Sequence, residues 1–129
     1  MKSILENSRK SDITFWRDGH IDICARVSRA LDLKAGDVID IAIDDGFSHE
    51  YYLYARRNGG GRNGRHEATC RAVNGERSRY MRVNSKRLTH FVLHTTGEAE
   101  QARVICGEVT EIPMGKAVVI IMKGKKVKG

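Results

Sequence analysis

Residues 19–43 read GHIDICARVSRALDLKAGDVIDIAI, and the spacing of the apolar side chains changes twice along this stretch. Ile21 and Ile23 alternate with polar residues, which is the pattern of a strand with one buried face. The apolar residues of 25–33 then follow at helical spacing, so this segment is expected to form a short helix held by packing. Residues 38–43 are rich in isoleucine, which predicts a strand buried largely on both faces. The stretch therefore predicts a strand, a helix and a second strand in close succession.

The flanking segments extend this pattern to a unit of four strands and one helix. Residues 12–17 alternate in polarity, and the Asp-Gly pair at 18–19 is a typical turn between antiparallel strands. The Asp-Asp-Gly sequence at 44–46 marks another turn, and residues 47–56 form a fourth expected strand, rich in tyrosine. The order expected for residues 12–56 is therefore β-β-α-β-β.

The same order is expected again in the second half of the chain, as an internal duplication. Residues 57–65 (RNGGGRNGR) contain four glycines and little that can pack, which is typical of a loop. Ser85 is a good helix N-cap, and Gly97 follows the last residue of the expected helix. The other expected elements are strands at 66–73, 79–83, 102–109 and 117–122. The predicted domain, 12–123, thus consists of the units 12–56 and 66–123, with an N-terminal extension at 1–11 and a basic tail at 124–129.

The segment at 31–37 has the form Leu-x-Leu-x-x-Gly-Asp and lies between the expected helix and the isoleucine-rich strand. Together with the flanking residues it resembles the AbrB-like (SpoVT-AbrB) family, in which Gly36 and Asp37 match the GD box of cradle-loop barrels. Glycine can take the positive φ of such a turn, and aspartate can accept hydrogen bonds from its amides. The proline usual in this family is Cys24 here, and Gly97-Glu98 is the nearest equivalent of a GD box in the second half.

This resemblance implies a mainly β fold with two short helices, a swapped-hairpin barrel built from two β-β-α-β-β units. One chain can supply both units as a monomeric pseudo-dimer, or two chains can form a homodimer; a double-psi barrel is the alternative architecture. Members of the family commonly bind DNA through the hairpin turn and the arginines near the helix start. The resemblance therefore implies roles for Arg17 and Arg29.

Positive charge is concentrated in the middle of the chain. The protein has 23 Lys and Arg against 16 Asp and Glu, a net charge of +7, and residues 56–90 alone hold ten basic and two acidic side chains. Guanidinium groups match the geometry of phosphate, so this block favours a polyanionic partner; a solvated surface is the alternative explanation. The candidate nucleic-acid-binding residues are Arg17, Arg26, Arg29, Arg62, Arg65, Arg79, Arg82, Lys86 and Arg87.

Length and composition exclude several classes of protein. A chain of 129 residues with 40% hydrophobic residues and one proline is expected to form one globular domain. The apolar run at 117–122 is too short to span a membrane, and the first residues do not form a secretory signal. The three cysteines are widely spaced and predict no disulfide framework. A soluble, reduced, cytoplasmic protein is expected.

The sequence contains no nucleophile elbow, phosphate loop or dinucleotide fingerprint. His90 and His94 are expected to share one helix face, but no third metal ligand accompanies them. No enzymatic activity, cofactor or metal is therefore expected. The leading hypothesis is a DNA-binding protein that regulates transcription. The alternatives are a non-catalytic interaction or assembly module that binds a protein or RNA partner, and a catalytic or small-ligand domain on the same barrel.

Overall fold

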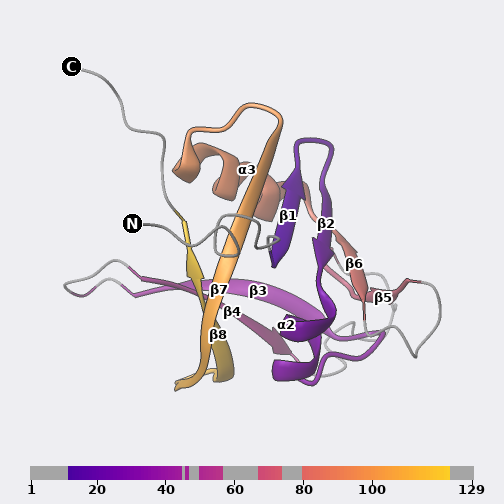
Figure 1. Ribbon diagram of the computed structural model, residues 1–129, viewed down its shortest axis with the longest axis vertical. Helices are drawn as coiled ribbons and strands as arrows, with labels where there is room; N and C mark the ends of the chain where they lie inside the picture. Colours follow the sequence, from indigo (N-terminus) through magenta and orange to yellow (C-terminus); the bar gives the residue numbers. More distant parts are fainter. Residues whose placement is uncertain (1–11, 45, 47–49, 57–66, 74–79, 123–129) are drawn as a thin grey trace, which may run out of the picture.

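The computed structural model describes residues 12–44, 46, 50–56, 67–73 and 80–122. Eight antiparallel strands form one curled sheet in the order β3-β4-β8-β7-β1-β2-β6-β5 (Figure 1). The strands are β1 (Ile13–Trp16), β2 (His20–Ile23), β3 (Val38–Ile43), β4 (Tyr51–Arg56), β5 (Arg71–Ala72), β6 (Met81–Asn84), β7 (Gln101–Ile112) and β8 (Gly115–Ile121), and the helices are α2 (Ala25–Ala30) and α3 (Lys86–Thr96).

The mainly β fold with two short helices confirms the expected fold class, and the described strands form a half-barrel. The outer strands of the sheet, β3 and β5, do not form a continuous ladder, and they are connected through an isolated bridge between Val38 and Thr69. Beside this bridge the amide of Ile39 donates to the carbonyl of Ala68 at 3.0 Å. The sheet is therefore an open, curled half-barrel whose two edges touch near one point.

The first hairpin forms where the sequence predicts it and joins the two halves of the chain. Gly19 has a φ of +107°, which only glycine adopts without strain, and its amide donates to the carbonyl of Trp16 at 2.9 Å. Strand β1 then pairs with β2 on one side and with β7 on the other. Because β7 comes from the second half, this pairing makes the two halves share one core.

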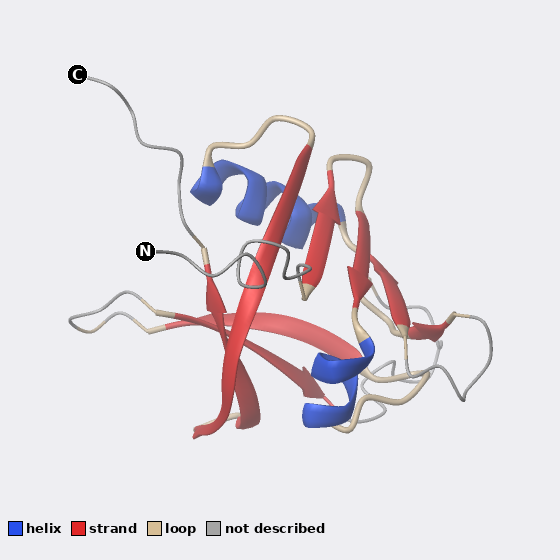
Figure 2. Ribbon diagram, viewed as in Figure 1, coloured by secondary structure: helices blue, strands red, loops and turns tan. Residues whose placement is uncertain are grey.

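The core lies inside the curl of the sheet. Phe15 in β1 and Ile21 in β2 are completely buried, and so are Val27 in α2 and Val92 in α3. Helix α3 packs against β1, β2 and β7, while α2 lies towards the opposite end of the molecule (Figure 2). Each helix thus buries one apolar face against the sheet and leaves its other face to carry polar side chains.

The Gly-Asp turn is built as its residue types predict. Gly36 has a φ of +97°, and the buried carboxylate of Asp37 accepts a hydrogen bond from the amide of Lys34 at 2.9 Å. Helix α2 ends at Ala30, earlier than the helix expected over 25–33. It ends there because Asp32 takes a positive φ of 52° and the amide of Leu33 bonds back to the carbonyl of Ser28 at 2.8 Å.

Several strand expectations need correction. Only the first part of β3 is buried, and its exposure rises to 48% at Ile43 because the β3–β4 hairpin extends beyond the core. The strand expected at 66–73 is reduced to the two residues of β5 plus the bridge at Thr69. Strand β6 begins two residues later than the predicted strand 79–83, and β7 is longer than the predicted strand 102–109. The loop expected at 57–65 lies outside the described residues.

Candidate nucleic-acid interface

Three of the predicted cations come together beside the β1–β2 turn. Arg17 follows β1, Arg82 belongs to β6 and Lys86 is the first residue of α3. The pairing of β2 with β6 places the start of α3 against the turn, where the amide of Ser85 donates to the carbonyl of Gly19 at 2.9 Å. Two shallow depressions meet at this place, and together they define the hairpin surface: Trp16, Arg17, Asp18, His20, Arg82, Lys86, His90 and Glu100.

The sheet register continues this polar surface across five strands. Thr14 of β1 stands opposite Arg103 of β7 on one side and opposite Asp22 of β2 on the other. Asp22 also stands opposite Arg82 of β6, and Arg82 stands opposite Arg71 of β5. Directly opposed residues lie on the same face, so these side chains form one row across the outside of the sheet. Three strand spacings of about 4.8 Å separate Arg103 from Arg82, so their Cα atoms are about 14 Å apart along the sheet. The row we call the arginine row is Arg103, Thr14, Asp22, Arg82 and Arg71.

Carboxylates accompany two of these cations, Arg82 and Arg17. Arg82 donates from Nε to Asp22 at 2.8 Å, and this hydrogen bond raises the pKa of Arg82. Asp22 is only 14% exposed, so the pair is partly shielded from water. Arg17 and Glu100, at 3.3 Å, are 67% and 77% exposed, so Arg17 can exchange this partner for a phosphate at little cost.

Asp18 lies between the two depressions and organises the tip of the hairpin. Its carboxylate accepts the amide of His20 at 3.0 Å and lies 2.9 Å from His20 Nδ1. These hydrogen bonds, the one from the backbone first, lower the pKa of Asp18. The carboxylate therefore stays ionised and holds the turn in the conformation that presents Arg17 and Lys86.

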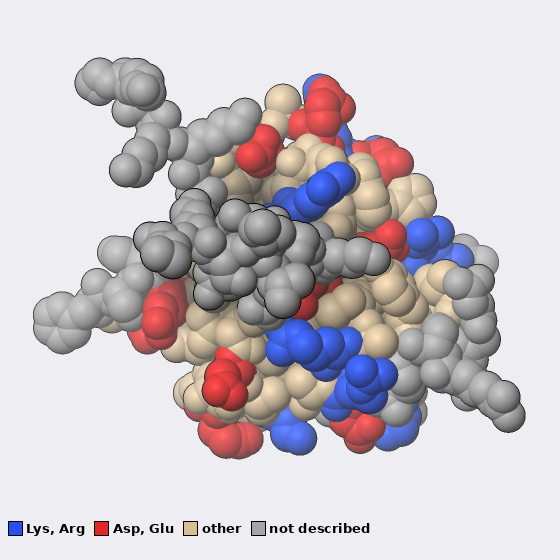
Figure 3. Space-filling model, in the orientation of Figure 1, with Lys and Arg blue, Asp and Glu red and all other residues tan. Residues whose placement is uncertain are grey.

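The two predicted arginines of α2 lie elsewhere and differ from each other. Arg26 donates to Asp12 from Nη2 at 2.7 Å and from Nε at 3.3 Å, and it also donates to the carbonyl of Cys106 at 3.0 Å. The hydrogen bond to Asp12 raises the pKa of Arg26. Arg29 is exposed and forms no ion pair with any described residue. Lys and Arg side chains gather over α2 in the view of Figure 3. Arg26 therefore holds the fold together, while Arg29 is available to a ligand.

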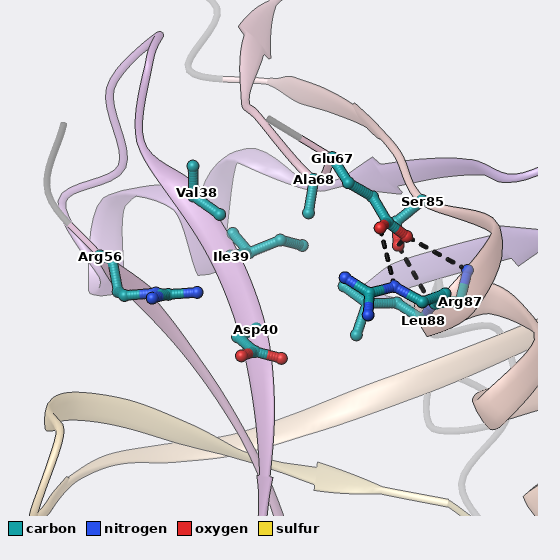
Figure 4. A pocket seen from close by; sticks show the side chains of 9 residues that line it. All are labelled: Val38, Ile39, Asp40, Arg56, Glu67, Ala68, Ser85, Arg87 and Leu88. Carbon is teal, nitrogen blue, oxygen red and sulfur yellow. Dashed lines mark hydrogen bonds and ion pairs between the residues drawn. The ribbon is translucent and has the colours of Figure 1, made fainter. Parts of the chain in front are cut away.

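Arg87 points into a separate pocket of about 270 Å³ at the meeting point of the two sheet edges (Figure 4). Arg56, at the end of β4, points into the same pocket from the opposite side, with Asp40 between them. The charge block of 56–90 includes Arg56, but the sequence offered no reason to place it beside Arg87. The contact between residues 37–39 and 68–70 creates this neighbourhood.

Glu67 caps α3 at the rim of this pocket. Its carboxylate accepts hydrogen bonds from Ser85 Oγ at 2.5 Å and from Arg87 Nε at 2.8 Å. Ser85 Oγ in turn accepts from the amide of Leu88 at 3.1 Å, as expected for the predicted N-cap. The hydrogen bond from Ser85, followed by those from Arg87, lowers the pKa of Glu67. Glu67 is thus the anion held at this helix start.

Glu67→Gln is expected to flatten the acid side of the pH profile of unfolding. The folded-state pKa lies below the ordinary value of 4.5, so the ionised carboxylate stabilises the fold above that pH. This contribution is lost as pH falls through the folded-state pKa. Urea unfolding of the wild type and the variant from about pH 6 to about pH 3 measures the difference. A variant whose stability falls as steeply as that of the wild type contradicts the expectation.

Charge is divided unequally between the described residues and the rest of the chain. The described residues carry eleven Lys or Arg and thirteen Asp or Glu, a net charge of −2. The other residues carry twelve basic and three acidic side chains, a net charge of +9, and account for the whole excess. The predicted residues Arg62, Arg65 and Arg79 belong to this second group and lie outside the described residues.

Comparisons with known proteins yield no relative: no protein-family model, curated protein or solved structure matches this chain. Among the described residues, no group of three or more His, Cys, Asp and Glu side chains could hold a metal ion. In the same part of the chain no helix is long and apolar enough to cross a membrane.

Some residues of the site were not predicted as such. Trp16 and His20 belong to the hairpin surface, and Arg71 and Arg103 to the arginine row. The alternation of 12–17 gave Trp16 the face opposite Phe15, which is the one sequence signal that could have found it. The positions of Arg71 and Arg103 depend on strand register between distant segments, which alternation within one strand does not determine.

Proposed function

We propose that this protein binds DNA as a transcriptional regulator, without catalysis or a cofactor, through contacts to the phosphate backbone. The observation that carries the proposal is the convergence of Arg17, Arg82 and Lys86 on the β1–β2 turn from three elements. The arginine row extends the cations of this surface along the sheet. The resemblance to AbrB-like proteins also implies a hairpin turn as the contact point with DNA.

The distribution of charge supports binding through backbone phosphates. The net charge of −2 on the described residues means that attraction to DNA must come from local cations and from the +9 of the other residues. Arg62, Arg65 and Arg79 remain predicted phosphate ligands within that second group. Contacts of this kind supply affinity and position, whereas Trp16 and His20 offer ring faces for stacking.

We further propose the two-unit, swapped-hairpin architecture for the whole domain. When β1 to β4 are exchanged in order with β5 to β8, the β1–β2 pairing corresponds to β5–β6 and the β3–β4 pairing to β7–β8, while β2–β6 and β4–β8 each correspond to themselves. The bridge at Val38 and Thr69 takes the place of the β1–β7 pairing. Equivalent helix positions support the same repeat, since Ser28 and Thr89 each bury an unpaired hydroxyl four residues after the helix N-cap. A double-psi barrel is the alternative.

Fluorescence anisotropy with mixed-sequence duplex DNA across a salt series tests the proposed function. The logarithm of affinity is expected to fall linearly with the logarithm of salt concentration, by about 0.9 per phosphate contact. Arg17→Ala combined with Lys86→Ala is expected to weaken binding on the order of tenfold at low salt and to reduce the salt slope by about 1.8.

The matched control removes two exposed cations from other places. Lys34 and Lys116 are both exposed and lie outside the hairpin surface, so Lys34→Ala combined with Lys116→Ala changes the net charge equally. This control is expected to weaken binding less than twofold. Equal losses from the two double variants would show that only net charge matters, and absence of binding at low salt would overturn the proposed function.

A further inference from the structure

A second surface lies between the β3–β4 hairpin, which runs to the left in Figure 1, and the β7–β8 hairpin, which runs to the bottom. A groove of about 410 Å³ separates the two hairpins there. The β7–β8 turn lies at the bottom of Figure 1 and the β1–β2 turn at the top, so this groove is remote from the hairpin surface. The hairpin-end groove is lined by Ala42, Ile43, Asp44, Tyr52, Glu111, Ile112, Pro113 and Met114.

The floor of the groove is apolar and open to solvent. Ile43 is 48% exposed and Met114 is 51% exposed, so two of the largest exposed apolar side chains of the described residues face this single feature. Both extend beyond the core, and neither contributes to the buried cluster. Clustered apolar side chains that stay in water at such a place are typical of a surface that a partner covers.

The rim of the groove is acidic. Asp44 and Glu111 line it from opposite hairpins, and the hydroxyl of Tyr52 donates to Glu50 at 2.5 Å, which holds a third carboxylate beside it. Lys116 stands opposite Glu111 in the strand register. The rim therefore carries these three carboxylates and one ammonium group. A ligand that fits both floor and rim therefore presents apolar side chains flanked by Lys or Arg.

We propose that the hairpin-end groove binds a protein segment in which apolar and basic side chains alternate. Such a segment places its apolar side chains against Ile43 and Met114 and its cations beside the rim carboxylates. An acidic rim repels nucleic acid, so this surface and the hairpin surface have different partners. The inference goes beyond the proposed DNA binding and does not depend on it.

The experiment uses fluorescence anisotropy with a short labelled peptide of alternating lysine and valine, in the absence of DNA. Two comparison peptides replace valine with serine or lysine with glutamate. The lysine–valine peptide is expected to bind at least about tenfold more tightly than either, because each comparison peptide lacks one of the two matching features. Equal binding of the lysine–serine peptide would reduce the interaction to charge alone and overturn the proposal.

Variants locate the binding site on the protein. Ile43→Ser combined with Met114→Ser is expected to weaken peptide binding about tenfold, and the exposure of both residues means that the fold is retained. The matched control is Ile105→Ser combined with Ile121→Ser, an exposed apolar pair that lies outside the groove. It is expected to change binding less than twofold.

Two further outcomes overturn this proposal, and both are independent of DNA binding. The first is an equal loss of peptide affinity in the groove variant, Ile43→Ser combined with Met114→Ser, and in the control variant. The second is no binding of the lysine–valine peptide at low salt. Arg17→Ala combined with Lys86→Ala is expected to leave peptide affinity unchanged, and the groove variant is expected to leave DNA affinity unchanged. Failure of one proposal is therefore distinguishable from failure of the other.

Discussion

Arg26→Ala is expected to lower the free energy of unfolding by about 3 kcal/mol, at the lower end of the range for breaking a buried ion pair. The Asp12 side chain is only 6% exposed, and Arg26 supplies two of its hydrogen bonds, at 2.7 and 3.3 Å. Removal of Arg26 leaves that carboxylate charged in a place with little water. The lower end applies because the guanidinium is itself 48% exposed.

The same carboxylate connects three separate parts of the chain. Asp12 accepts from the amide of Cys106 at 2.8 Å and lies 3.6 Å from Cys24 Sγ, so it joins the start of β1 to α2 and β7. Without Arg26, the junction between the first and second halves loses three hydrogen bonds, two to Asp12 and one to the carbonyl of Cys106. The loss is therefore expected to appear as global unfolding rather than as fraying of α2.

Urea unfolding of Arg26→Ala and Arg29→Ala measures this effect. Arg29 is exposed on the same helix and forms no ion pair with a described residue, so Arg29→Ala is expected to change stability by less than about 0.5 kcal/mol. A double-mutant cycle with Asp12→Asn isolates the coupling between the two partners. Equal stabilities of Arg26→Ala and Arg29→Ala would show that the ion pair does not hold the fold.

Phe15→Ala is expected to cost about 4 kcal/mol, a large part of the stability of a domain of this size. Phe15 has no exposed surface, and its strand is paired on both sides, with Ile21 opposite in β2 and Ala102 opposite in β7. Loss of the ring removes apolar burial and leaves a cavity that the two neighbouring strands cannot close, because their ladders hold them at fixed spacing.

Thermal and urea unfolding compare this variant with two others. Phe15→Leu keeps most of the volume and is expected to lose about 1–2 kcal/mol. Ile43→Ala removes a side chain that is 48% exposed and is expected to change stability by less than about 0.5 kcal/mol. A small loss for Phe15→Ala, similar to that for Ile43→Ala, would contradict the placement of Phe15 in the core inside the curl of the sheet.

Much of the local structure could be predicted from residue types. The turn at Asp18-Gly19, the N-cap at Ser85 and the positive φ of Gly36 depend on interactions within a few residues, so the sequence determines them directly. The end of α2 could not be placed from apolar spacing, because its last turn is set by Asp32 in a left-handed conformation. Local chemistry therefore predicted the elements better than it predicted their ends.

The candidate site was predictable in composition and not in arrangement. The charge block indicated arginines, and the family resemblance indicated the hairpin turn, but neither showed that Arg82 is paired with Asp22 or Arg26 with Asp12. Partners 60 and 14 residues apart meet only through strand pairing and helix packing. The pairing with the buried Asp12 marks Arg26 as a cation that holds the fold, whereas Arg82 lies on the hairpin surface beside its partner Asp22.

Periodicity, turn chemistry and composition were sufficient to predict the mainly β class, the order of strands and helices in the two halves and the excess of positive charge. Three features appear only in the folded molecule: the sheet stays open, Arg17, Arg82 and Lys86 meet at one turn, and an apolar groove with an acidic rim forms between the β3–β4 and β7–β8 hairpins. The physical reason is that the register between distant strands is set by how the whole core packs, and no local pattern contains that information.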